Sequence, residues 1–193
     1  MGELFFKALT TSFFIMVVYV NTLLAESHSQ NLSQGIFLPA ETGINSFIYY
    51  GEITAGDAEA LSRLIKTNHV ENIIMSSPGG LVYEALDIAY IVKEKKISIL
   101  IPKDQFCLSA CAFIFFAGNA RVSEGQLGVH QVNFPDRAAK RIGKLGEITR
   151  DSQLVVSDII SALNRFGVPK FVYEKMFATE DMYFFTSDEI REI

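Results

Sequence analysis

From residue 44 onward, the hydrophobic and polar positions follow two alternating patterns. Short apolar runs that end at glycine, proline or polar residues are typical of buried strands, and apolar residues three and four positions apart are typical of amphipathic helices. The strand-like runs are residues 47–50, 72–75, 97–101, 121–122 and 127–129. The helix-like stretches are residues 56–65, 81–94, 109–117, 148–166 and 171–177.

This order predicts an α/β fold with repeated β-α-β units and a mostly parallel sheet, because helices are the usual crossovers between parallel strands. The chain has 193 residues, 49% of them hydrophobic, which is enough to bury the core of one domain over residues 44–193. Helix 148–166 has more apolar surface than one face requires, so we expect it to contact a second copy of the chain in a homo-oligomer. Its apolar residues include Leu154, Val155, Ile159, Ile160 and Leu163.

The first 25 residues have a different pattern. Lys7 precedes a nearly unbroken apolar run that ends at Ala25, and polar residues follow. This order predicts a secretory signal peptide cut after Ala25, with a polar lead-in over residues 26–43. The alternative is a membrane anchor that stays on the protein. Both place the domain outside the cytoplasm, in the periplasm or another exported location.

Charge and composition narrow the classes of partner. The net charge is −5 with both signs spread along the chain. No basic patch is present, which argues against a nucleic-acid partner. The two cysteines, Cys107 and Cys111, have no neighbouring histidine and make an incomplete set of metal ligands. We therefore expect no metal and no other cofactor.

Candidate chemistry lies where predicted strands end, which is where α/β folds collect their active sites. Residues 76–80 (Ser-Ser-Pro-Gly-Gly) follow one strand, and their glycines allow a sharp turn whose amides approach a negatively charged group. Ser109 stands at the start of the apolar helix, where a serine acts either as an N-cap or as a nucleophile. His130 ends another predicted strand and is one of three histidines.

These three places resemble the motifs of the Clp-protease peptidase family, which has a crotonase-like fold. The Ser-Pro-Gly-Gly turn matches residues 77–80, and the hydrophobic-His-Gln motif matches residues 129–131. The family's nucleophile is followed by Ala-Phe and later Ala-Gly, as Ser109 is here, and the resemblance extends over about residues 47–189. It implies three roles: Ser109 as nucleophile, His130 as its general base, and the amides of Gly80 and Ala110 as the oxyanion hole.

The third catalytic residue departs from the family's pattern. The family has an aspartate shortly before a Phe-hydrophobic-Thr/Ser segment, and its position falls on Ala178 here. The resemblance leaves Glu180 or Asp181 to take that role after a local shift. Membrane-associated relatives use a Ser-Lys pair, for which Lys140 and Lys144 are the candidates, and a solvated basic loop is the other interpretation of these lysines.

Cys107 and Cys111 flank Ser109 and leave two alternatives open. If Cys107 lies in the loop before the helix, a disulfide can form and would brace the nucleophile turn. If both residues are already helical, the bond would strain the backbone and the pair stays reduced. An oxidising compartment permits the bond.

Together these features predict an exported serine peptidase that cleaves peptides or protein segments. It would work without ATP and without a partner ATPase, because an exported protein has no ATP supply. Two other classes also fit the sequence. One is a catalytically impaired scaffold or binding protein that oligomerises through helix 148–166, and the other is an acyl-CoA enzyme of the crotonase type. An uncleaved N-terminal segment would add association with a membrane.

Overall fold

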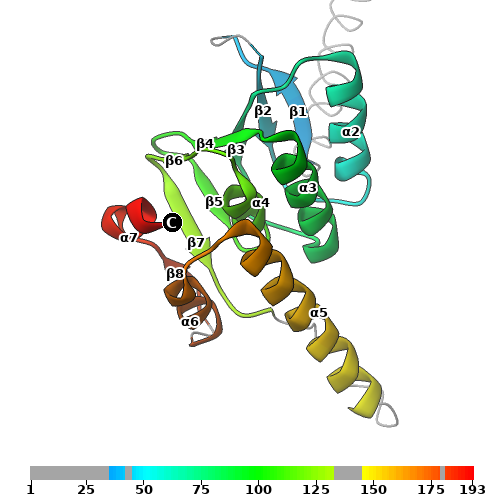
Figure 1. The fold of residues 1–193 in the computed structure, drawn as a ribbon, viewed down its shortest axis with the longest axis vertical. Helices are drawn as coiled ribbons and strands as arrows, with labels where there is room; N and C mark the ends of the chain where they lie inside the picture. Colours follow the sequence, from blue (N-terminus) through cyan, green and yellow to red (C-terminus); the bar gives the residue numbers. More distant parts are fainter. Residues whose placement is uncertain (1–34, 42–44, 133–144, 179–180) are drawn as a thin grey trace, which may run out of the picture. The chain divides into compact units, whose positions relative to one another are not determined.

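Two β-sheets form the framework of the computed structural model, which describes residues 35–41, 45–132, 145–178 and 181–193. The larger sheet has five strands in the order β1-β2-β3-β4-β6. β1 pairs antiparallel with β2, and all other neighbours in this sheet are parallel. Its strands are β1 (Ile36–Pro39), β2 (Ser46–Tyr50), β3 (Asn72–Ser76), β4 (Ser98–Ile101) and β6 (Arg121–Ser123) (Figure 1).

The smaller sheet has three strands in the order β5-β7-β8, namely β5 (Phe106–Leu108), β7 (Gln126–Val129) and β8 (Tyr183–Phe184). β5 and β7 are parallel, and β8 is antiparallel to β7. A bridge joins the end of β3 to β5: the Ser77 amide donates to the Phe106 carbonyl at 2.8 Å, and the Leu108 amide donates to the Ser77 carbonyl at 3.0 Å. The turn after β3 is therefore held beside the end of β5.

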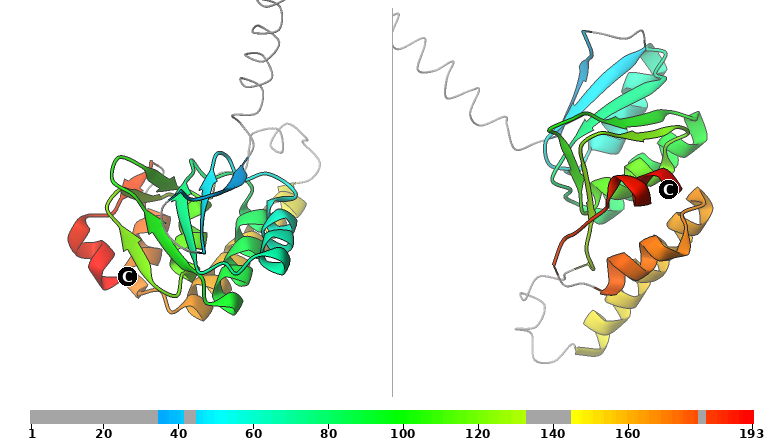
Figure 2. Two further views of the ribbon diagram at one scale, coloured as in Figure 1. Left: turned by 90° about the horizontal axis from the view of Figure 1, so that it is seen from above. Right: turned by 90° about the vertical axis from the view of Figure 1, so that its left-hand side faces the viewer.

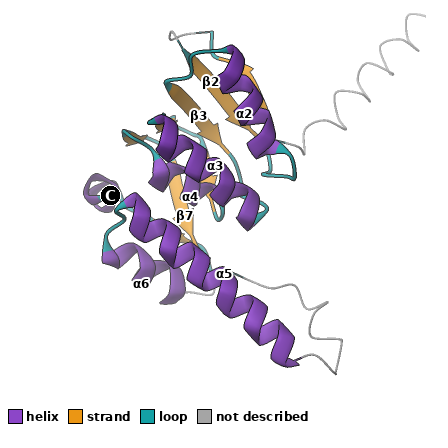
Figure 3. Ribbon diagram, turned by 45° about the vertical axis from the view of Figure 1, so that its right-hand side comes forward, coloured by secondary structure: helices purple, strands orange, loops and turns teal. Residues whose placement is uncertain are grey.

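The helices pack against one another in a chain of contacts. α3 contacts α2, α4 and α5, and α4 also contacts α5; Figure 3 shows them in the order α2, α3, α4, α5. The Glu84 carboxylate of α3 accepts hydrogen bonds from the Gly56 and Ala58 amides at the start of α2, which ties these two helices together. The helices are α2 (Asp57–Thr67), α3 (Val82–Lys95), α4 (Cys111–Ala117), α5 (Leu145–Phe166), α6 (Lys170–Ala178) and α7 (Ser187–Glu192).

The core lies between the sheets and these helices, and every residue of α4 is buried in it. One polar pair is buried near its edge. The Tyr49 hydroxyl donates to the Asp57 carboxylate at 2.8 Å, and the Thr54 amide donates to the same oxygen at 2.7 Å. Burial is the main cause that raises the pKa of Tyr49, and the Asp57 hydrogen bond adds to it. The tyrosine therefore stays a neutral donor and satisfies the buried carboxylate.

The end of the chain lies beside β6 and β7 (Figures 1 and 2). Arg121 of β6 donates to the carbonyls of Gly118, Phe166 and Ile193. One guanidinium thus fixes the turn after α4, the end of α5 and the last residue of the chain. Partial burial lowers the pKa of Arg121, and the three backbone oxygen acceptors satisfy its guanidinium.

The α/β class and the mostly parallel sheet are confirmed. Each predicted strand and helix between residues 44 and 178 has its counterpart in the structure. The lead-in is the exception: part of it forms β1, which pairs with β2, so the folded unit begins at Gly35 rather than at residue 44. The predicted signal peptide or anchor, residues 1–25, lies outside the described residues. Within the described part, no helix has the length and hydropathy that crossing a membrane requires.

Candidate active site

The site is built where β3, β5 and β7 end. The turn 77–80 follows β3, Ser109 follows β5, and His130 follows β7. The Ser109 amide donates to the Gly128 carbonyl at 2.9 Å, which extends the β5–β7 pairing by one hydrogen bond past the end of β5. The parallel strands thus bring the three sequence motifs to one edge of the fold, as expected for α/β folds.

Ser109 has a left-handed backbone with φ of 55°, one of four non-glycine residues with a positive φ in the described chain. β5 ends at Leu108 and α4 begins at Cys111, so Ser109 occupies the tight turn between them. The N-cap of α4 is Ala110, and no side chain caps this helix. The N-cap interpretation of Ser109 is therefore wrong, and its hydroxyl is directed to another partner.

That partner is His130. The distance between His130 Nε2 and Ser109 Oγ is 2.7 Å, and both side chains are partly buried. His130 Nδ1 lies 2.6 Å from the Gln131 carbonyl oxygen, which can only accept a hydrogen bond. Nδ1 must therefore carry the proton, which leaves Nε2 of the neutral ring as the acceptor for the serine hydroxyl. This is the arrangement in which a histidine can act as general base to a serine.

A carboxylate does not complete the site among the residues that the structure describes. Asp181 is exposed, and the Gln131 carbonyl is the partner of His130 Nδ1. Ala178 ends α6, and Glu180 lies outside the described residues, as do Lys140 and Lys144. A neutral carbonyl fixes the tautomer of His130, but it supplies no negative charge to stabilise an imidazolium.

The Gly79-Gly80 turn lies directly against the Ser109 turn. A Cβ on Gly79 would lie 2.8 Å from the Ser109 Cβ and 3.1 Å from the Ala110 nitrogen, so only glycine permits this approach. Gly79 and Gly80 also have φ values of 103° and 144°, where a side chain is strained. A Cβ on Gly80 would lie 2.2 Å from the Ile53 carbonyl oxygen.

The amides of Gly80 and Ala110 are available to a ligand. The Gly79 amide donates to Ser77 Oγ, and the Leu81 amide donates to the Ile53 carbonyl. In the described part of the chain, the amides of Gly80 and Ala110 donate no hydrogen bond. One of these amides lies in the glycine turn that packs against Ser109, and the other directly follows Ser109. An oxyanion hole requires two unused amides placed in this way beside the nucleophile.

A disulfide joins Cys107 of β5 to Cys111, the first residue of α4. The Cα atoms are 5.2 Å apart, and both residues are wholly buried. Cys107 precedes the helix, so the structure has the first of the two arrangements that the sequence left open. The bond encloses Ser109 in a short covalent ring.

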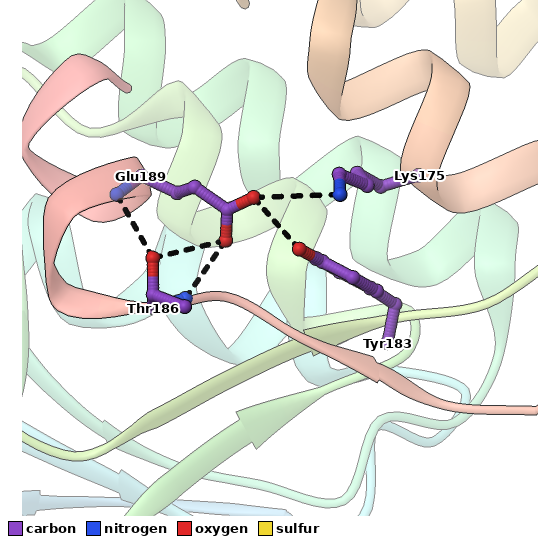
Figure 4. Close-up of polar contacts among 4 residues, drawn as sticks. All are labelled: Lys175, Tyr183, Thr186 and Glu189. Atoms are coloured by element: carbon purple, nitrogen blue, oxygen red, sulfur yellow. Dashed lines mark hydrogen bonds and ion pairs between the residues drawn. The ribbon is translucent and has the colours of Figure 1, made fainter.

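A polar cluster that the sequence analysis did not identify holds β8 in place (Figure 4). The Glu189 carboxylate accepts from the Tyr183 hydroxyl at 2.7 Å and from the Thr186 amide at 2.9 Å, and lies 3.6 Å from the Lys175 ammonium. These contacts anchor β8, which pairs with the end of β7 next to His130. The spacing Thr-x-x-Glu is that of a capping box, a sequence signal that could have located this cluster.

The same contacts shift the pKa values of Glu189 and Lys175. The Thr186 amide is the main cause that lowers the pKa of Glu189, followed by the Tyr183 hydroxyl. The pKa of Lys175, which lies over the Tyr183 ring, is raised.

In the described part of the chain, no three His, Cys, Asp or Glu side chains gather as metal ligands would.

Comparison with known proteins supports the fold. The chain resembles the solved structure of a ClpP1 mutant from Listeria monocytogenes, with a TM-score of 0.53 and 21% identity. The match covers 77% of this chain and 86% of the Listeria chain. No protein-family model matches the sequence, and no curated protein matches it either. The chain therefore has a ClpP-like fold, and its activity must be argued from the site.

Proposed function

We propose that this protein is a serine hydrolase that cleaves peptide bonds, with Ser109 as nucleophile and His130 as general base. The observation that carries the proposal is the 2.7 Å contact between His130 Nε2 and Ser109 Oγ, made by a serine in a left-handed turn. The left-handed turn costs energy for a residue with a side chain, and here it places Ser109 beside His130 and two unused amides, as a nucleophile requires.

The chemistry follows from the geometry. His130 Nε2 takes the proton as Ser109 Oγ attacks the peptide carbonyl carbon, and the amides of Gly80 and Ala110 bind the oxyanion of the tetrahedral intermediate. The C–N bond breaks when His130 returns the proton to the leaving amine. Water, activated by the same histidine, then releases the acyl group from Ser109.

Export is the second part of the proposal. A structural disulfide persists in an oxidising compartment, which agrees with the signal peptide predicted over residues 1–25. No ATP is available there, so short peptides or exposed protein segments would be the substrates, without a partner ATPase. Sequencing the N-terminus of the protein from the cell envelope tests this part. A first residue of Glu26 supports cleavage, and an intact Met1 would contradict it.

Fluorophosphonate labelling tests the chemistry. The reagent reacts with activated serines, so the wild-type protein should be labelled at Ser109, and Ser109→Ala should abolish labelling. His130→Ala should slow it by about 10²–10⁴-fold, the usual contribution of a general base. Circular dichroism of each variant controls for folding. A folded wild type that is not labelled would refute the hydrolase.

A scaffold or binding protein is the second candidate, and one observation favours it. His130 Nδ1 has a carbonyl rather than a carboxylate as its partner, so the imidazolium intermediate lacks a counter-charge. The scaffold would retain the fold and a Ser-His contact without turnover. A protein that fails to label but binds unfolded peptides with the same affinity before and after Ser109→Ala would establish this alternative.

A further inference from the structure

The covalent ring around Ser109 has no role in the chemistry described above. The bond between Cys107 and Cys111 closes across Leu108, Ser109 and Ala110. Its two ends belong to different elements, since Cys107 is paired in β5 and Cys111 starts α4. The ring therefore sets the distance between the strand that ends before Ser109 and the helix that begins after it.

The turn inside the ring is strained and closely held. A non-glycine residue adopts the left-handed conformation of Ser109 at a steric cost, so the surrounding structure must impose it. Hydrogen bonds hold the turn on both sides: Leu108 to the Ser77 carbonyl, Ser109 to the Gly128 carbonyl, and Ala112 to the Ser109 carbonyl. The disulfide adds a covalent restraint on the turn to these three hydrogen bonds.

A ring this short contributes less to global stability than a longer one. The chain-entropy contribution of a disulfide grows with the number of residues in the closed loop, and a sequence separation of 4 lies at the low end, at about 2 kcal/mol. The bond also has a local effect. It restricts the conformations of the three residues that include the nucleophile.

Opening the bond would displace the turn. Bonded sulfurs lie about 2.0 Å apart, whereas non-bonded atoms in a packed core need roughly 3.5–4.0 Å. Both cysteines are wholly buried, and all of α4 is buried around Cys111, so the separated sulfurs have no free space. Either the end of β5 or the start of α4 must move, and each is joined directly to the Ser109 turn.

We propose that the Cys107–Cys111 disulfide is a positioning element for Ser109, and that the reactivity of this serine depends on the oxidised state of the pair. The inference rests on the proposed function, in which Ser109 is a nucleophile. An external dithiol can reduce the disulfide. In this reaction the S–S bond breaks, each cysteine sulfur takes up one electron and one proton, and the dithiol becomes a disulfide. The protein then has two thiols and a relaxed turn.

The test compares wild-type protein with a Cys107→Ala/Cys111→Ala double variant by the rate of fluorophosphonate labelling. The variant removes the covalent tether between β5 and α4, so we expect the turn to lose its position and the rate to fall by about 10²-fold, the loss typical of a ~1 Å misplacement in an active site. The matched control is Leu61→Ala, which also removes buried volume but lies in α2, an element that packs mainly on α3 and β1. It should lower the melting temperature and leave the labelling rate of the folded protein unchanged. An unchanged rate in a folded double variant would overturn the proposal.

Two further measurements keep the outcome decisive. If the double variant does not fold, wild-type protein reduced with a dithiol and then reoxidised replaces it, and labelling must fall and recover. If the oxidised wild type does not label at all, the proposed hydrolase is wrong, and amide hydrogen exchange at Ser109 decides the role of the disulfide. Faster exchange of this amide after removal of the bond supports positioning, and equal exchange rates refute it.

Discussion

At the scale of single residues, Ser109 balances a steric cost against hydrogen bonds. The left-handed conformation costs about 1–2 kcal/mol for a residue with a side chain. Its amide and carbonyl each take part in one backbone hydrogen bond, and each such bond contributes roughly 1 kcal/mol net. The two effects nearly cancel, so the turn depends on its neighbours, and Gly79 packs directly against it.

Gly79 tests that dependence. Gly79→Ala would place a Cβ 2.8 Å from the Ser109 Cβ, so we expect the nucleophile to shift and labelling to slow by about 10²-fold. Gly167→Ala is the matched control, because it has a positive φ of 73° but no atom within 4 Å of the added carbon. The control should lose about 1–2 kcal/mol of stability by its conformation alone and label normally. Equal labelling of both variants would contradict the contact between the turns.

The partner of His130 Nδ1 gives a second prediction at this scale. Because the Gln131 carbonyl fixes the tautomer, removing the two candidate carboxylates that the sequence offered, those of Glu180 and Asp181, should not change the chemistry. Asp181→Asn and Glu180→Gln should therefore label at the wild-type rate. A loss of about 10²-fold or more in either variant, within the range of a general-base defect, would identify that residue as the third catalytic member.

The sequence located the glycine turn and His130 because each stands at the end of a strand-like run, and Ser109 because it stands at the start of an apolar helix. It could not predict the conformation of Ser109, since the hydrogen bond from its amide reaches Gly128, which is remote in the chain. For the same reason, the sequence left the cysteine pairing open: the answer depends on where β5 ends. The partner of His130 also escaped prediction, because a backbone carbonyl leaves no sequence pattern.

At the scale of elements, the shortest strands were the hardest to predict. β6, with 3 residues, was found, whereas β5, also with 3, and β8, with 2, were missed because so few residues show no clear alternation. β1 was missed because residues 26–43 were interpreted together as a polar lead-in, although residues 36–38 are a short apolar run; it is an edge strand with Ile36 and Leu38 exposed. These short elements matter to function, since β5 precedes Ser109 and β8 supports the end of β7.

Glu189 gives the prediction for these elements. Its pKa is lowered in the folded protein, so its charge stabilises the fold above the ordinary glutamate pKa, and this contribution is lost as pH falls through the lowered value. Glu189→Gln retains the capping geometry but removes the charge. We expect the variant to have a lower melting temperature than wild type at pH 7, by a few degrees for about 1 kcal/mol.

The sign of the pH dependence is the decisive part of that experiment. The difference in melting temperature between wild type and Glu189→Gln should shrink as pH falls below about 4.3, the ordinary glutamate pKa. Lys170→Met, which removes the exposed surface pair with Glu174, is the control and should have little effect at any pH. A difference that stays constant down to about pH 3, below the ordinary glutamate pKa, would show that the Glu189 charge has no role in anchoring β8.

At the scale of the whole molecule, α5 leaves apolar surface uncovered. Val155, Ile159 and Leu163 are buried against the domain, as a single amphipathic face requires. Leu154 is 55% exposed and lies one turn from Asp158, whose carboxylate accepts from the exposed Tyr83 of α3. Large exposed apolar side chains on a helix, such as Leu154 and Ile160 of α5, are typical of a surface that contacts another protein.

A second copy of the chain is the expected occupant of this surface, so Leu154→Glu should reduce the mass of the assembly in solution. The introduced charge would have to be buried without a partner in the interface, which costs far more than the lost apolar contact. Gln153→Glu is the matched control, because it adds the same charge to the neighbouring exposed position of α5. Light scattering after gel filtration should show wild type and the control as oligomers and Leu154→Glu as smaller. A monomeric wild type would contradict self-association, and an undiminished Leu154→Glu assembly would place the interface on another surface.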